Sequence, residues 1–190
     1  MTRQSIVAAV FGAAVAAVVP AHADDSIGRA PAALCATAAI RPLTHVRAAD
    51  PDLAEALADG LRRSPTLASL VERIESSDGI VFLFRGPFYR LRRGTTLRGA
   101  MSHEVTVTPP FRIIKIAVEP RLGDRTIATL GHELRHALEV LEDSSAVDKD
   151  SVEGLYRRIG YGVSVGQYET SAAHDAERGI FRDLGRCKTR

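Results

Sequence analysis

The sequence predicts an α+β domain in which a small, mainly antiparallel sheet packs beside one long amphipathic helix. Three observations favour this class: helical segments come first, β-rich runs fill the middle, and helical periodicity returns near residue 124. Of the 190 residues, 45% are hydrophobic and 25% charged, a composition that suits one hydrophobic core. We expect a single domain over residues 24–190, closed by C-terminal helices.

The first 23 residues have the composition of a secretory signal peptide. Arg3 precedes an apolar run over residues 6–19, and Ala21-His22-Ala23 supplies the small residues that a signal peptidase reads. The run is short for a spanning helix, and no later stretch reaches that length. We therefore expect export to the periplasm or secretion, with no stable membrane insertion after cleavage. An uncleaved N-terminal anchor is the alternative.

Two helices are expected after an irregular segment at residues 24–49. Asp50-Pro51 and Ser64-Pro65 each place a capping side chain before a proline at the first helical position. Apolar residues then recur at helical spacing, which predicts a buried face on each helix. They are Leu53, Ala56, Leu57 and Leu61 in the first helix, and Leu67, Leu70, Val71 and Ile74 in the second.

Strands are expected between residues 80 and 118. The runs 80–84 and 111–118 are apolar and β-rich, which is typical of buried strands. Residues 103–108 alternate in polarity, which predicts a half-buried strand before the break at Pro109-Pro110. Residues 88–97 predict a hairpin with its turn at residues 92–95.

The helix expected over residues 124–141 carries the motif His132-Glu133-Leu134-Arg135-His136. A leucine-rich stripe marks the face that packs on the core, and both histidines fall on the opposite face. Because they are four residues apart, the imidazoles point the same way, as a zinc site on a helix requires. Glu133 falls beside that metal position, where it can take a proton from a zinc-bound water.

A catalytic zinc site needs a third protein ligand. Glu142 would require a sharp turn after the motif, but the helix pattern continues, so we reject it. A helix expected over residues 167–184 carries Glu169 on its apolar face, where a carboxylate is costly unless it is paired or bound to a cation. Glu169 is therefore the candidate ligand, whereas His174 and Glu177 lie further round that helix. The alternative is that Glu169 binds no metal and is only a first-turn glutamate, which the positive N-terminal end of the helix dipole stabilises.

The motif of His132, Glu133 and His136, followed 33 residues later by Glu169-Thr-Ser-Ala-Ala, resembles the gluzincin metallopeptidases of the zincin clan. The resemblance covers residues 112 to 180. It implies a zincin-like domain in which His132, His136 and Glu169 bind zinc and Glu133 is the general base. It also implies that an upstream strand, for which residues 111–118 are the nearer candidate, pairs with an extended peptide substrate.

The sequence leaves the supporting groups of this site open. Gluzincins usually place an aspartate where this chain has Ala173, and the possible substitutes are Asp143, Asp148 and Asp175. A tetrahedral oxyanion would need a donor besides the metal. Residues between or beside the two ligand segments could supply it, although ordinary packing explains each of them equally simply. They are Tyr156, Tyr161, Tyr168 and His174.

Cys35 and Cys187 are the two cysteines of the chain and predict a disulfide between the ends of the mature domain. In an oxidising compartment, two thiols allow only this intramolecular pairing. Closing so long a loop contributes about 4–5 kcal/mol in the chain-entropy description. The alternative is two unpaired thiols.

The sequence therefore predicts an exported hydrolase with Zn²⁺ as cofactor, most simply a metallopeptidase acting on a peptide or protein substrate. The net charge of +2, the 5% aromatic content and the absence of tryptophan argue against a nucleic-acid partner. One alternative is an exported zinc-binding protein without catalysis, in which Glu133 has no role. The other is an interaction domain in which the motif is accidental.

Overall fold

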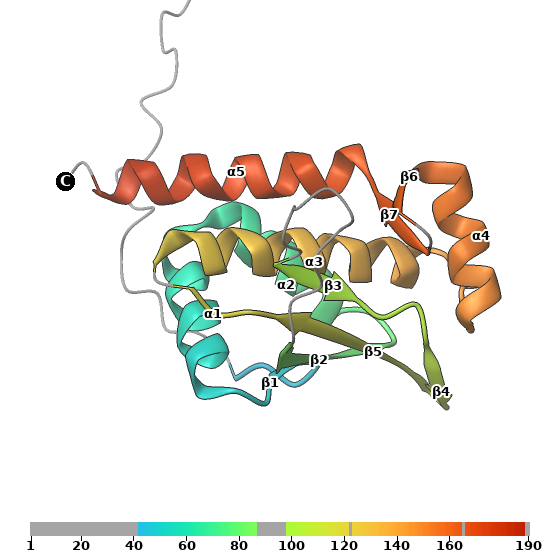
Figure 1. Cartoon of the computed structure of the whole chain (residues 1–190). Coiled ribbons are helices and arrows are strands. Elements are labelled where there is room, and N and C mark those ends of the chain that lie inside the picture. The colour runs from blue at the N-terminus through green and yellow to red at the C-terminus, as the bar shows by residue number, and fades with distance from the viewer. Residues whose placement is uncertain (1–41, 87–97, 122, 165, 189–190) are drawn as a thin grey trace, which may run out of the picture. The chain divides into compact units, whose positions relative to one another are not determined.

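The computed structural model describes residues 42–86, 98–121, 123–164 and 166–188 (Figure 1). The predicted signal peptide at residues 1–23 and the predicted hairpin at residues 88–97 lie outside them and stay predictions. Within the described ranges, no helix combines the length and the apolar character needed to cross a membrane. The elements, in chain order, are β1 (Val46–Ala48), α1 (Pro51–Arg63), α2 (Pro65–Glu75), β2 (Gly79–Arg85), β3 (Gly99–Met101), β4 (Thr106–Thr108), β5 (Phe111–Val118), α3 (Asp124–Glu142), α4 (Lys149–Ile159), β6 (Tyr161–Ser164), β7 (Gln167–Glu169) and α5 (Ser171–Lys188).

The α+β class is confirmed, but the main sheet is mixed rather than mainly antiparallel. Its order is β1-β2-β5-β3, and β4 also pairs with β5. The pairs β1–β2 and β2–β5 are parallel, whereas β3 and β4 run antiparallel to β5. The parallel β1–β2 pair arises because α1 and α2 form the crossover that returns the chain to the same end of the sheet. Strand β1 was not predicted, because it has only three residues and lies in the segment expected to be irregular.

The two N-terminal helices and the two long strands form as predicted. The Asp50 carboxylate accepts from the amides of Asp52 and Leu53, and the Ser64 hydroxyl accepts from the amide of Leu67, so both predicted caps are present. The strand expected over residues 103–108 is confined to β4, where all three residues are exposed, because β4 lies beyond the helices that cover the rest of the sheet.

The helix with the histidine motif, α3, lies between the main sheet and α5 (Figure 1). On one side it covers the fully buried side chains of the central strands. On the other side α5 approaches so closely that a Cβ at Gly131 would clash with Ile180. The histidine face is therefore covered, contrary to expectation, and His132 and His136 are only 8% and 5% exposed. The buried strand residues are Val81, Leu83, Ile114, Ile116 and Val118.

The C-terminal helix begins later than predicted. Residues 161–169 form the two-stranded hairpin β6–β7, and Gly166 turns it with a φ of 66°. The Thr170 hydroxyl then accepts from the amide of Ala173, at 3.1 Å, and so caps α5. Glu169 consequently lies on a strand that ends just before the helix, not on the apolar face of the helix.

The far end of α5 packs near the junction of α1 and α2. The Asp183 carboxylate accepts from the Ser64 hydroxyl at 2.9 Å and from the Thr66 amide at 3.1 Å. The sulfur of Cys187 lies 3.6 Å from the carbonyl oxygen of Arg63. Its predicted partner, Cys35, lies outside the described residues, so the disulfide stays a prediction.

A buried arginine of β5 holds the C-terminal end of α3. Arg112 is 5% exposed, and its guanidinium forms two 2.8 Å contacts with the Asp78 carboxylate. The same group donates to four backbone carbonyls at and just after the C-terminal end of α3, where the helical hydrogen bonds end. They belong to Val140, Leu141, Asp143 and Ala146.

Candidate metal centre

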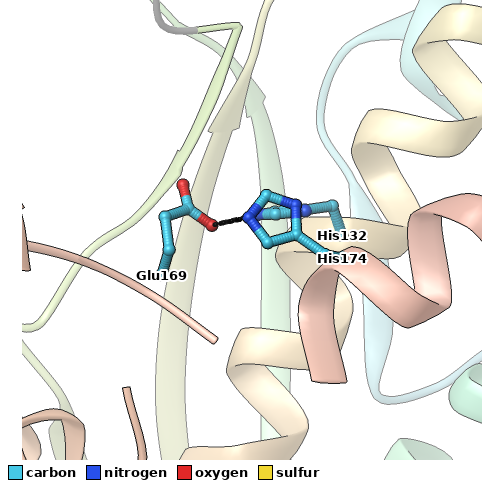
Figure 2. A group of neighbouring side chains, drawn as sticks. All are labelled: His132, Glu169 and His174. Carbon is cyan, nitrogen blue, oxygen red and sulfur yellow. Dashed lines mark ion pairs between the residues drawn. The ribbon is translucent and has the colours of Figure 1, made fainter. Parts of the chain in front are cut away.

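Four side chains from three elements converge beside the middle of α3. His132 and His136 come from α3, Glu169 from the end of β7, and His174 from the first turn of α5. The Oε2 atom of Glu169 lies 3.0 Å from Nε2 of His132, 3.7 Å from Nε2 of His136 and 3.6 Å from Nε2 of His174. Figure 2 shows the Glu169 carboxylate facing the rings of His132 and His174. One carboxylate oxygen is thus surrounded by three imidazole nitrogens.

The local structure explains how Glu169 reaches α3. The β6–β7 hairpin pairs it with Tyr161, and the next residue, Thr170, fixes the start of α5. The Thr170 hydroxyl also donates to Oε1 of Glu139 on α3, at 2.8 Å. The junction between β7 and α5 is therefore tied to the helix that carries the histidines.

The structure brings together all three predicted ligands and adds a fourth residue that the sequence analysis set aside. Three candidate metal donors, His132, Glu169 and His174, have ligand atoms within 4.8 Å of one another, and this group does not include His136. His174 was set aside because the helix was expected to begin at residue 167. With α5 beginning at Ser171, His174 lies on its first turn, next to Glu169. The threonine before a run of alanines was the sequence signal for this later start.

Two glutamates face the Nδ1 atoms of the histidines. Nδ1 of His136 lies 3.0 Å from Oε2 of Glu139, one turn further along α3. Oε2 of Glu177 lies 3.7 Å from Nδ1 of His132 and 3.9 Å from Nδ1 of His174. Metal-binding histidines usually face a carboxylate or carbonyl with their second nitrogen, which fixes the tautomer and the ring orientation.

The aspartates proposed for this supporting role have other partners. Asp143 accepts from Ser145 and Arg158, Asp148 caps α4, and Asp175 pairs with Arg178. None of these contacts reaches the histidines, so Glu139 and Glu177 replace the aspartates as the supporting carboxylates.

Two buried atoms of the cluster make no hydrogen bond among the described residues. They are Oε2 of Glu169 and Nδ1 of His132. Of the three nitrogens near Glu169 Oε2, only Nε2 of His132 lies within hydrogen-bond distance, and it is not aligned for a hydrogen bond. Leaving such atoms unpaired costs about 1–3 kcal/mol each. A cation bound between the nitrogens and the oxygen would satisfy Glu169, so these residues fit a metal ion.

The charges of the cluster also favour a cation. Burial lowers the pKa of a histidine, but the carboxylates of Glu169 and Glu177 outweigh it and raise the pKa of His132 to about 10. Glu139 and Glu169 raise the pKa of His136 to about 9 against the same effect of burial. Burial raises the pKa of a carboxyl group, yet the two imidazoles hold the pKa of Glu169 at about 2. The site stabilises positive charge, whether carried by protons or by a metal ion.

The predicted general base, Glu133, lies in a small cavity with Glu169 and His136. Burial raises the pKa of Glu133, although the charges of the neighbouring histidines oppose the shift. Gly99 on β3 packs against it so closely that a Cβ there would lie 2.6 Å from its Oε1. The cavity volume of about 60 Å³ has room for water but not for a peptide.

The candidate oxyanion donors differ in their surroundings. The hydroxyl of Tyr161 lies 3.0 Å from Nε2 of His174 at the edge of the cluster. The hydroxyl of Tyr156 instead donates to the backbone carbonyl of His136 at 2.9 Å, and Tyr168 stacks on the Tyr156 ring with centroids 6.0 Å apart. Tyr156 and Tyr168 therefore pack the site, and Tyr161 and His174 remain as the polar pair beside it.

The chain matches no protein-family model, no curated protein and no solved structure. The gluzincin resemblance therefore stays a prediction from the motif, and the function of the site is inferred from its own residues.

Proposed function

We propose that the chain is a zinc-dependent hydrolase, and specifically a metallopeptidase in which His132, His136 and Glu169 bind the metal. One observation carries the proposal. The Glu169 carboxylate oxygen reaches Nε2 of both motif histidines from another element and makes no hydrogen bond there. Zinc, when bound, supplies a Lewis acid for a carbonyl group and for water.

In this reaction Glu133 is the group that accepts and returns the proton. Its raised pKa suits a general base, because a base works best when its pKa lies near the working pH. The protonated carboxyl group of Glu133 can then pass this proton to the leaving amine. Gly99 leaves the space that the side chain needs beside the sheet.

Residues 111–118 cannot pair with a substrate as the resemblance implies, because β5 has neighbours on both sides. In the described part of the chain, β3 is an edge strand of this sheet, as are β1 and β4, and Gly99 to Met101 of β3 also line the cavity with Glu133. We therefore assign the pairing of an extended peptide to β3. The β6–β7 hairpin lines the same cavity, so the part of the hairpin before Glu169 must move to admit a peptide while Glu169 stays on the metal.

The proposal is tested by zinc content and peptide hydrolysis of the wild type, Glu133→Gln and Glu169→Ala after dialysis. We expect about one zinc per chain in the wild type and in Glu133→Gln, and marked loss in Glu169→Ala. Glu133→Gln should lower kcat by about 10²- to 10⁴-fold, since only proton transfer is removed. A wild type that binds no zinc, even after refolding with the metal, would refute the proposal.

A zinc-binding protein without catalysis is the second candidate. The small cavity and the fourth donor beside the predicted three ligands favour it. It predicts the same zinc content but no zinc-dependent hydrolysis of any peptide, and Glu133→Gln would then change neither property.

A further inference from the structure

We infer that His174 is a fourth protein ligand, so that three imidazoles and the Glu169 carboxylate surround the metal ion. The inference depends on the proposed zinc site but not on the proposed hydrolysis. It differs from the ligand set that the motif implies, in which a fourth position stays open for water.

The first support is the spacing of the donor atoms. Ligands that lie about 2.0–2.1 Å from zinc in a tetrahedron are about 3.3–3.4 Å from one another. The distances from Glu169 Oε2 to the three Nε2 atoms are 3.0, 3.6 and 3.7 Å. The His174 distance is as close to the tetrahedral value as those of the two motif histidines. The donor atoms of His132, Glu169 and His174 also lie within 4.8 Å of one another, in a group that does not include His136.

The second support is that all three imidazoles point the same way, although only His136 is hydrogen-bonded to its outer carboxylate, at 3.0 Å, and the Glu177 contacts of His132 and His174 are longer, at 3.7 and 3.9 Å. Each turns Nε2 toward Glu169 and Nδ1 toward another glutamate, which is Glu139 for His136 and Glu177 for His132 and His174. Glu177 lies one turn after His174 on α5, so a single carboxylate faces a histidine from each helix.

His174 is also the ligand that can exchange. Its side chain is 37% exposed, whereas those of His132 and His136 are 10% and 7% exposed. The Tyr161 hydroxyl, 3.0 Å from His174 Nε2, offers that nitrogen another partner. Four protein donors close a tetrahedral site, so the outermost histidine must leave before water or a substrate reaches the metal. The Tyr161 hydroxyl is positioned to form a hydrogen bond with His174 Nε2 once that nitrogen has left the metal.

The test compares metal binding by the full chain in three forms: wild type, His174→Ala and His45→Ala. His45 is a control histidine whose ring meets that of Phe111 edge to face, with ring centroids 5.7 Å apart, and it takes no part in the cluster. Zinc affinity is measured by competition with a chelator, and coordination by the visible absorption of the cobalt-substituted chain.

We expect His174→Ala to bind zinc more than about 100-fold more weakly than wild type, because the loss of an outer supporting group costs only about 10- to 100-fold. Its cobalt spectrum should change, because a water replaces a nitrogen, and added imidazole should restore it. His45→Ala should match wild type in both measurements. Unchanged affinity and spectrum in His174→Ala would overturn the inference and leave the zinc site intact. Absence of metal from all three forms would overturn the inference and the proposed function together.

Discussion

Two buried polar clusters lie along the same helix, α3, and they are built in opposite ways. At the C-terminal end, all three nitrogens of the Arg112 guanidinium donate to the Asp78 carboxylate or to backbone carbonyls. At the middle of the helix, Glu169 Oε2 has three nitrogens nearby and a hydrogen bond to none among the described residues.

The difference separates a structural cluster from a binding site. A network whose donors and acceptors are all paired stabilises the fold and needs nothing further. In the second cluster the polar atoms point at a common position, and the Nδ1 atoms of the histidines face other carboxylates. Such an arrangement suits a ligand at that position. The two clusters should therefore respond differently to mutation, to zinc and to pH.

The largest effect on stability should come from the cluster around Arg112. Arg112→Met removes the buried partner of Asp78 and the guanidinium donor to the Leu141 and Val140 carbonyls of α3, which should lower the free energy of unfolding by about 3–5 kcal/mol. Urea denaturation of the metal-free chain measures it. Lys115→Met, at an exposed position on the same strand, is the matched control and should change stability by less than about 0.5 kcal/mol. Equal midpoints for the two variants would remove the structural role of Arg112.

Zinc should stabilise the chain only through the cluster around Glu169. At a free zinc concentration 100 times Kd, a ligand that binds only the folded state adds about 2.7 kcal/mol to the free energy of unfolding. Glu169→Gln should abolish this increment, whereas Lys115→Met should keep it. Unfolding with and without a chelator measures both. The same increment in Glu169→Gln as in wild type would place the zinc elsewhere.

The pH dependence of the metal-free chain should also come from the histidines. Their folded pKa values of about 10 for His132 and about 9 for His136 exceed the ordinary value of 6.5. The contribution of the two protonated histidines to the free energy of unfolding is therefore full below pH 6.5 and is lost as the pH rises through 9 and 10. The folded chain then holds more protons than the unfolded chain, so the free energy of unfolding should fall by about 2 kcal/mol from pH 7.5 to 8.5.

The control for this pH effect is the double variant His132→Gln with His136→Gln, which should lose most of the slope. Zinc replaces the protons, so binding should release protons into the buffer at pH 7.5 and should strengthen as the pH rises. Calorimetry in buffers of different ionisation enthalpy measures that release. Binding without proton release would mean that the histidines are not the ligands.

Much of the fold follows from local patterns in the sequence. The Asp50 and Ser64 caps, the two long strands and the motif helix could be predicted, because each depends on residues adjacent in the chain. The parallel arrangement of β1 and β2 could not, because it depends on where the crossover returns the chain. The same holds for Arg112, whose partners lie about 30 residues away along the chain.

The candidate site shows the same limit. The motif predicted His132, Glu133 and His136 directly, because helical spacing alone places them together. Glu169 was chosen for a helical face that it does not occupy, since the hairpin and not the helix positions it. His174 was set aside by the same error in the start of α5. A shift of four residues in a helix boundary thus decided which side chains were expected to face the metal.

The smallest effect should come from Thr170, which joins that boundary to α3. Thr170→Val removes the cap of α5 and the hydrogen bond to Glu139, and should lower the free energy of unfolding by about 1 kcal/mol. Zinc affinity should fall roughly 10-fold, because Glu139 then holds His136 less firmly. Thr170→Ser keeps the hydroxyl and should preserve both properties. If Thr170→Val lost stability but kept its zinc affinity, the threonine would serve only the helix, and Glu139 would hold the imidazole without its help.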